Sequence, residues 1–150
     1  MKKHLFNGLS NKEASIFYHF LCIYEQSVKP YLSTEVFRQL YPKATEIIDK
    51  LDIEILSKKK YLDMPNRIQG EKIILIGNKN KKEYEFFRHL RNALAHGLLR
   101  KTQTGYYIYE DMIEKNNGQK TALCRVKKEK IDDIFKVILV EYWKSIKNNQ

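Results

Sequence analysis

The sequence predicts a mostly helical, all-α domain: an antiparallel bundle of four to five helices with one small β-hairpin inserted before the last helix. Two observations support this. Apolar residues recur at helical spacing through most of the chain, and two strand-like segments flank the turn signal Asn116-Asn117-Gly118. The chain has 150 residues and contains no internal repeat or linker rich in Pro, Gly and Ser. We therefore expect one domain over residues 1–150.

The first helix is predicted to begin at a capping box, because Ser10 and Glu13 have the S-x-x-E spacing. Apolar residues follow at helical spacing, and we expect the helix to end before Pro30. A second helix is predicted to begin at Ser33 or Thr34 and to be broken or kinked by Pro42. Its apolar stripe is expected to continue through Ile47, Ile48, Leu51 and Ile55.

Residues 57–72 are expected to form a loop. The run Ile73-Ile74-Leu75-Ile76 fits either a buried strand or core-filling extended chain, and periodicity does not decide between them. A third helix is predicted from Asn80 to His96, with Gly97 at the position of a C-terminal cap. The hairpin is expected to pair residues 106–109 with residues 121–126, and the last helix to run through about residue 146.

The charge of the chain points to an anionic partner. Lys and Arg together number 28 against 18 Asp and Glu, which gives a net charge of +10. Nucleic acid is the first expectation for such a surface. Only six of the basic residues are Arg, the better marker of phosphate recognition, so a merely solvated lysine-rich surface is the alternative.

Other partners and cofactors are not expected. No apolar stretch is long enough to span a bilayer, and the N-terminal residues do not resemble a signal peptide, so we expect a cytoplasmic protein with no membrane partner. Cys22 and Cys124 lie far apart and are expected to be reduced thiols. His89 and His96 are two helical turns apart, too far to share one zinc ion. We therefore expect no metal and no cofactor.

The candidate catalytic residues are Arg91, Asn92 and His96, at the end of the predicted third helix. At 100° and 1.5 Å per residue, Arg91 and His96 lie about 140° apart around the helix axis and about 7.5 Å apart along it. One helix therefore brings them together poorly. We expect a homodimer in which the two copies of this helix meet, with the small Ala95 permitting close approach.

These three side chains suit RNA cleavage without a metal, because the 2′-hydroxyl of RNA is its own nucleophile. Histidine is the usual general acid or base near neutral pH, and arginine stabilises negative charge on a phosphate. Asn92 would orient the imidazole or bind the phosphate. The alternative for His96 is a plain C-terminal histidine that interacts favourably with the helix dipole.

Five further residues are candidate RNA ligands, and Arg88 and the lysines among them have structural alternatives. Arg88 is equally compatible with an ion pair to Glu85. The lysines are equally compatible with a solvated surface. For Tyr106, Tyr107 and Tyr109, packing is favoured over base stacking. The candidate RNA-binding residues are Arg88, His89, Lys82, Lys127 and Lys128.

The segment Arg91-Asn92-Ala93-Leu94-Ala95-His96, late on a helix and followed by a hairpin and a closing helix, resembles the HEPN superfamily. The resemblance implies an all-α bundle, often a homodimer, that acts in many members as a metal-independent endoribonuclease in toxin–antitoxin or phage-defence systems. It implies that Arg91, Asn92 and His96 are the catalytic motif, and it leaves open whether an antitoxin or regulatory partner exists. One toxin subgroup has a tyrosine, adenylylated by the antitoxin, where this chain has Leu98, so that route of neutralisation is not expected here.

Two other functions stay open on the sequence alone. The first is a non-catalytic HEPN-like domain that binds RNA or a protein. The second is a helical DNA-binding protein, which would place a helix in the major groove. The best-defined helix has no row of base-reading side chains, and this weakens the second.

Overall fold

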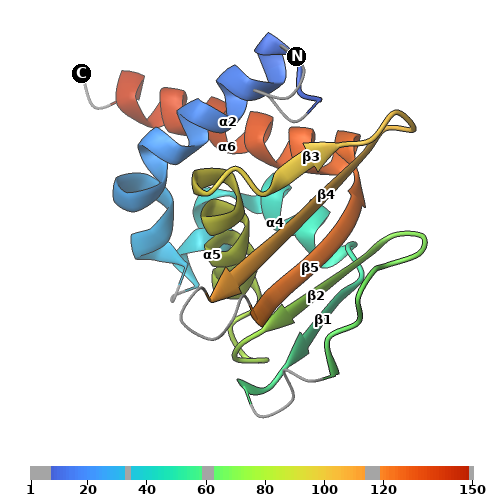
Figure 1. Ribbon diagram of the computed structural model, residues 1–150. Helices are drawn as coiled ribbons and strands as arrows, with labels where there is room; N and C mark the ends of the chain where they lie inside the picture. The colour runs from blue at the N-terminus through green and yellow to red at the C-terminus, as the bar shows by residue number, and fades with distance from the viewer. Residues whose placement is uncertain (1–7, 33–34, 59–62, 114–118, 149–150) are drawn as a thin grey trace.

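The structure is a computed structural model that describes residues 8–32, 35–58, 63–113 and 119–148. It is an α+β fold in which helices pack on one face of a five-stranded mixed sheet, as Figure 1 shows. The expectation of an all-α bundle with a small hairpin is therefore wrong. The hairpin exists, but it forms the centre of the sheet.

The strand order is β1-β2-β5-β4-β3. The central hairpin joins β4 (Tyr106–Ile113) to β5 (Gln119–Lys127), and its turn lies outside the described residues. A two-stranded hairpin is marginally stable alone and has two unpaired edges. Here β3 (Leu99–Lys101) pairs with β4, and β2 (Lys72–Ile76) pairs with β5, both antiparallel. The outermost strand, β1 (Ile53–Leu56), runs parallel to β2.

The run Ile73-Ile74-Leu75-Ile76 is therefore a strand, one of the two alternatives that its sequence allowed. The expectation that Ile55 continues a helical stripe is wrong. It lies in β1, opposite Leu75 of β2. Its spacing from Ile47, Ile48 and Leu51 fits a helix, but Ile53 and Ile55 also have the two-residue period of a strand.

The first helix matches its prediction. The helix α2 (Asn11–Ile23) begins at Ser10, whose hydroxyl accepts a hydrogen bond from the backbone N–H of Glu13 at 3.1 Å. The Glu13 carboxylate accepts from the N–H of Ser10 at 2.8 Å, which completes the capping box. A π-helical turn (Tyr24–Val28) and a 3₁₀ turn (Lys29–Tyr31) continue the chain through Pro30.

The break at Pro42 is confirmed. It separates α3 (Val36–Leu40) from α4 (Pro42–Asp49), and Tyr41 between them has non-helical torsions of φ −128° and ψ 61°. A residue before proline is driven out of the helical region by the proline ring. The predicted start at Ser33 or Thr34 lies outside the described residues.

The predicted third and last helices are α5 (Lys82–Ala95) and α6 (Lys128–Asn148). Gly97 follows α5 with φ +69°, as expected of a residue that ends a helix in the left-handed conformation. None of the described helices is long and apolar enough to cross a bilayer.

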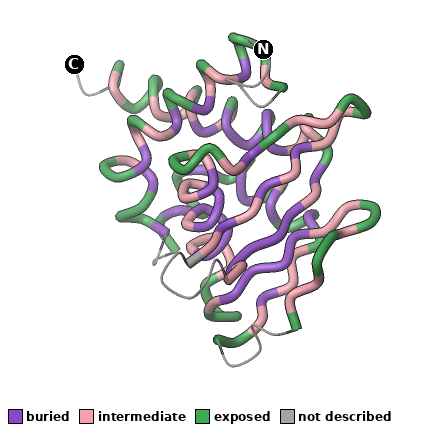
Figure 2. Tube along the Cα trace, in the orientation of Figure 1, coloured by how far each residue is buried: buried purple, intermediate pink, exposed green. Residues whose placement is uncertain are grey.

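The core lies between the sheet and the helices, and Figure 2 shows the buried residues gathered there. Alternate residues of β4 and β5 point into it, among them Tyr107, Tyr109, Cys124 and Val126. The packing alternative for Tyr107 and Tyr109 is thus confirmed, since both are fully buried.

One polar network ties four elements together at the edge of this core. The hydroxyl of Tyr107 donates to Asp132 at 2.6 Å and lies 3.3 Å from the Glu13 carboxylate. Glu13 also accepts from Lys101 at 2.8 Å and from Lys128 at 2.7 Å. Burial acts to raise the pKa of Glu13, but the hydrogen bonds from the two lysines and Ser10 lower it to about 2. The network therefore holds α2, β3, β4 and α6 together while its carboxylates are ionised.

Candidate active site

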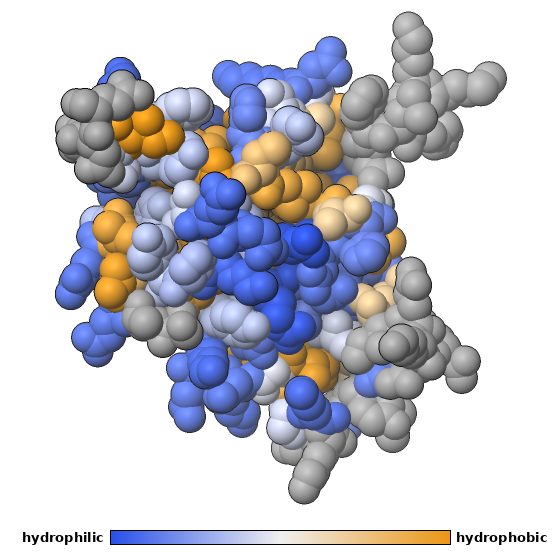
Figure 3. Space-filling view, turned by 90° about the vertical axis from the view of Figure 1, so that its left-hand side faces the viewer, coloured by the Kyte–Doolittle hydropathy of each residue, from blue (hydrophilic) through white to orange (hydrophobic). Residues whose placement is uncertain are grey.

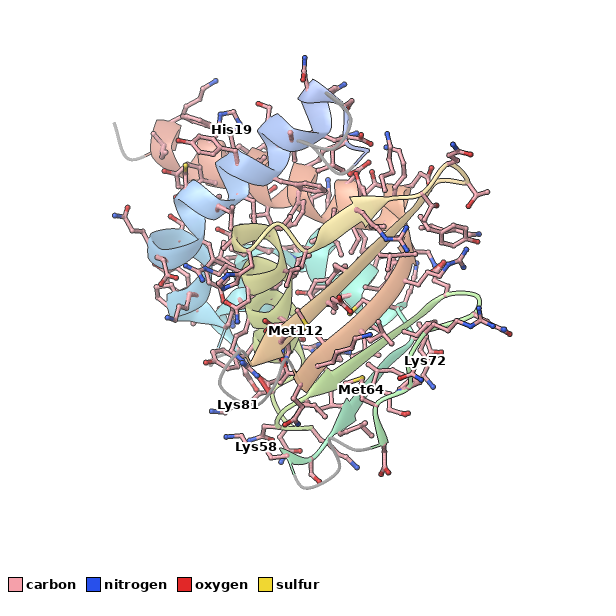
Figure 4. The ribbon with its side chains drawn as sticks, in the orientation of Figure 1. His19, Lys58, Met64, Lys72, Lys81 and Met112 are labelled. Carbon is pink, nitrogen blue, oxygen red and sulfur yellow. The ribbon has the colours of Figure 1, made fainter. Side chains whose placement is uncertain are left out.

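A cleft of about 1060 Å³ lies where β1, β2 and β4 end and β5 begins. Its lining includes side chains from α5 and from the ends of the strands. Figure 4 labels three of its lining residues, Lys58, Lys81 and Met112, in the lower half of the view, with His19 far from them at the top on α2. The lining residues used below are Lys58, Lys81, Glu85, Arg88, Asn92, His96, Asp111 and Met112.

The floor of the cleft is a hydrogen-bonded group that joins α5 to β4. Asp111 on β4 is 5% exposed, and its Oδ2 lies 3.0 Å from Nδ1 of His89 and 3.1 Å from Nδ2 of Asn92. Its other oxygen accepts from the backbone N–H of Met112 at 2.9 Å. Burial alone would raise the pKa of Asp111, but the hydrogen bonds from His89, Asn92 and Met112 leave it lower than usual. Asp111 is therefore ionised near neutral pH, and both His89 and Asn92 donate to it.

The Asp111 site coincides with an irregularity in the hairpin. The register of β4 against β5 shifts between Asp111 and Met112, so that Asp111 pairs with Ala122 and Met112 with Lys120. Such a bulge re-aims side chains and interrupts the ladder of backbone hydrogen bonds. Here the Asp111 carboxylate supplies the partner for the N–H of Met112 at that point.

His89 has no exposed surface, so its expected role as an RNA ligand is replaced by a positioning role. Its Nε2 lies 2.9 Å from the carbonyl oxygen of Ile76 and 3.0 Å from Nη2 of Arg88. The ring can accept from Arg88 when neutral, or donate to Ile76 when charged. The charged form therefore links the end of β2 to α5 directly, and in the neutral form Arg88 makes that link, because its Nη2 lies 3.4 Å from the Ile76 carbonyl oxygen.

Arg88 forms the ion pair with Glu85 that the sequence left as an alternative, with Nε 2.9 Å from Oε1. Glu85 is almost fully buried and accepts from the backbone N–H of Asn78 at 2.9 Å. Its carboxylate occupies the space beside Gly77, where an added Cβ would lie 1.4 Å from Oε2. A glycine at position 77 is therefore required for this packing. Arg88 still lines the cleft, and its side chain is 36% exposed.

The three candidate catalytic residues are only partly brought together in one chain. His96 ends α5, is exposed, and lines the cleft with Asn92, whose backbone carbonyl accepts from the His96 N–H at 3.0 Å. Arg91 is not among the lining residues. Its Nε lies 3.8 Å from Glu25, and its Nη1 donates to Oδ1 of Asn92 at 3.2 Å. Arg91 thus reaches the cleft only through Asn92, as expected from its separation from His96 around the helix.

The lysines predicted as RNA ligands are placed elsewhere, and two of them, Lys82 and Lys128, are paired with carboxylates. Lys82 is 2.7 Å from Asp49. Lys128 is in the network with Glu13 and Asp132. Lys127 is the last residue of β5. It lies six residues after Thr121, which lines the cleft, so the two residues are about 20 Å apart along the strand. Among the described residues, the lysines that line the cleft are Lys58 and Lys81 instead.

Sequence reasoning missed Asp111 and the structural importance of Glu85. A signal for Asp111 was present: Tyr107, Tyr109 and Asp111 share the inward-facing period of β4, and a carboxylate in a core position needs partners. Its partners are 22 and 19 residues away in the sequence, on a different element.

Among the described residues, no group of three or more His, Cys, Asp and Glu side chains is arranged to hold a metal ion. Comparisons with protein-family models, curated proteins and solved structures find no match to this chain.

Proposed function

We propose that the protein is a metal-independent endoribonuclease and that the cleft around His96 is its active site. The observation that carries the proposal is the placement of an exposed imidazole, His96, beside the amide of Asn92 in a cleft whose accessible charge is positive. Lys58, Lys81 and Arg88 line it. The described part of the lining has two carboxylates against these three cations: Glu85 is ion-paired with Arg88, and Asp111 accepts hydrogen bonds from His89, Asn92 and Met112.

The chemistry needs a base for the 2′-hydroxyl, charge stabilisation for the phosphorane, and an acid for the leaving 5′-oxygen. The 2′-oxygen attacks the adjacent phosphorus as its proton passes to a histidine, and the bond from phosphorus to the 5′-oxygen breaks as that oxygen takes up a proton. The products are a 2′,3′-cyclic phosphate and a 5′-hydroxyl.

His96 is the proton-transfer group in this scheme. The amide of Asn92 donates to Asp111 and accepts from Arg91, so its second hydrogen remains to donate to a phosphate oxygen. Arg88 adds a permanent charge.

A homodimer is part of the proposal, because one cleft offers a single exposed imidazole and no direct contribution from Arg91. A second copy of α5 laid over the exposed Ala95 would bring the partner's motif close, so that one imidazole acts as base and the other as acid. A cytoplasmic location and a role as a toxin or phage-defence effector, with an antitoxin or regulatory partner, remain parts of this proposal.

The resemblance of residues 91–96 to the HEPN motif supports the activity, although the all-α fold that the resemblance implied is wrong. The runner-up is a non-catalytic HEPN-like domain that binds RNA or a protein. It is favoured by the same single imidazole, since a cleft with one proton-transfer group and several cations binds a phosphodiester without needing to cleave it.

The test is RNA cleavage by purified protein in excess EDTA, followed by identification of the new ends. We expect cyclic-phosphate and 5′-hydroxyl ends from the wild type and none from His96→Ala or Arg91→Ala. His19→Ala is the matched control, because His19 is an exposed histidine at the far end of the molecule (Figure 4). It should retain full activity.

Two results would refute the proposal. The first is equal activity of His96→Ala and wild type. The second is continued cleavage of a substrate with a single 2′-deoxy substitution at the scissile nucleotide. Binding of RNA without cleavage by folded, dimeric protein would favour the runner-up.

A further inference from the structure

The face of the sheet turned away from the core carries an unusual row of cations. We call the side chains of β2, β3, β4 and β5 that point away from the helices the outer face. Lys72, Arg125, Ile108 and Arg100 are successive cross-strand partners there, one from each of four neighbouring strands. Figure 1 shows these strands in front of α4 and α5, with no described helix covering them.

This row places like charges directly opposite each other. Lys72 and Arg125 are cross-strand partners, and such pairs destabilise a sheet. Part of the repulsion is offset by neighbours: Lys72 lies 3.6 Å from Glu54, and Arg125 donates to the carbonyl of Gly70. The Arg100 side chain is exposed and has no hydrogen bond or ion pair to any described residue.

A second pocket, of about 410 Å³, lies on the outer face. Arg67, Arg100, Lys120 and Arg125 line it, against one acid, Glu110, which pairs with Lys120 at 3.2 Å. Arg67 comes from the connection before β2, is exposed, and like Arg100 has no partner among the described residues. The pocket therefore has an excess of positive charge and two cations that are free to bind an anion.

The outer face also offers stacking surfaces. The guanidinium of Arg125 lies over the ring of Tyr106, 3.7 Å from its centre. Tyr106 is thus the one tyrosine of Tyr106, Tyr107 and Tyr109 that points away from the core. Guanidinium planes and aromatic rings are the groups on which unpaired bases stack, and Ile108 and Leu98 add apolar surface beside them.

The outer-face pocket adjoins the active-site cleft. On β4, Glu110 lines the pocket and Met112, two residues later, lines the cleft. On the neighbouring strand β5, Lys120 lines the pocket and the adjacent Gln119 lines the cleft. Likewise Gly97 lines the pocket immediately after His96 in the cleft. From Ile108 to Met112 the distance along β4 is about 13 Å, which a few nucleotides span. Figure 3 shows a side view in which hydrophilic surface occupies the centre, with smaller hydrophobic patches around it.

We propose that the outer face binds single-stranded RNA through Arg67, Arg100 and Arg125 and leads it into the cleft at His96. The path of the RNA toward His96 rests on the proposed function. The binding surface itself does not depend on that function. Phosphates would contact Arg67 and Arg100, and a base would stack on the Arg125 guanidinium. The row of like charges is then neutralised by the ligand.

The test measures binding without cleavage. The probe is a short, fluorescein-labelled oligouridylate with 2′-O-methyl groups throughout, so that it cannot be cut, and the readout is fluorescence anisotropy in EDTA over a range of salt concentrations. The variant is Arg67→Glu/Arg100→Glu, which removes no hydrogen bond to a described residue and should unfold at the wild-type temperature. The control is Lys12→Glu/Lys136→Glu, which makes the same change in net charge at exposed positions of α2 and α6.

We expect the arginine variant to bind about tenfold or more weakly, and its slope of log affinity against log salt to fall by about 1.4, or 0.7 for each lost phosphate contact. The lysine control should bind as the wild type does. Unchanged binding by the arginine variant, an equal loss in the lysine control, or a preference of the wild type for duplex DNA would each overturn the inference.

The two proposals fail in distinguishable ways. Cleavage that depends on His96, together with unchanged probe binding by the arginine variant, would leave the nuclease and remove the outer-face site. Weakened binding by that variant in a protein that never cleaves RNA would leave the site and remove the nuclease.

Discussion

Replacing Asp111 with asparagine tests the hydrogen-bonded floor of the cleft. The carboxylate accepts three hydrogen bonds, from His89, Asn92 and the backbone N–H of Met112. An asparagine has nearly the same shape but only one acceptor oxygen. Whichever way the amide is placed, its NH₂ group faces a donor.

The cost follows from these contacts. With the amide oxygen toward His89 and Asn92, two charge-assisted hydrogen bonds become neutral ones, which loses about 1 kcal/mol each. The NH₂ group then faces the N–H of Met112, which leaves a buried donor unpaired at about 1 kcal/mol more. We therefore expect Asp111→Asn to lower the free energy of unfolding by about 3 kcal/mol at pH 7, or roughly 10 °C in Tm for a domain of this size.

The pH dependence supplies a second readout. The pKa of Asp111 in the folded protein is lower than its ordinary value of 3.8, so its ionised form stabilises the fold above about pH 4. That stabilisation is lost as the pH falls through the folded pKa. The difference in stability between wild type and Asp111→Asn should therefore be constant from pH 7 to pH 5 and become smaller below pH 4.

The assay is urea unfolding followed by circular dichroism at each pH. Asp133→Asn, an exposed aspartate on α6, is the matched control and should change stability by less than about 0.5 kcal/mol. A loss at Asp111 no greater than at Asp133, or a difference that grows in acid, would show that the carboxylate does not hold α5 to β4.

Two further predictions concern packing and charge elsewhere in the fold. Gly77→Ala should cost about 2 kcal/mol in urea unfolding, because its Cβ would meet the Glu85 carboxylate, and should cost much less in a Glu85→Ala background. Glu13→Gln should lower Tm at pH 7 but flatten the loss of stability in acid, because the pKa of Glu13 is about 2 in the folded chain against 4.5 ordinarily, so its contribution is present above pH 4.5 and disappears toward pH 2. A pH profile of Tm parallel to that of the wild type would contradict this assignment.

Local signals in the sequence were enough to locate several elements. The Ser10 to Glu13 capping box, the break at Pro42 and the glycine after α5 each depend on residues within four positions of one another. The hairpin of β4 and β5 was likewise predicted from alternation around a turn signal.

The sheet was not predicted, because its outer strands carry little information of their own. β1 and β3 have four and three residues, too few to show a period. Their pairing depends on the free edges of other strands, which is a property of the assembled fold. The same holds for the site: the motif of Arg91, Asn92 and His96 is local, whereas the contacts of Asp111 with α5 are not.

The contact between Asp111 and α5 limits where this chain can change length. Because side chains alternate between the two faces of a strand, an insertion or deletion of one residue between Tyr109 and Asp111 would turn the carboxylate from His89 toward solvent. Residues added in the turn around Gly105, which has φ +88° and precedes β4, would not reverse that alternation. Natural variation in length before Asp111 should therefore be concentrated in this turn and excluded from the strand.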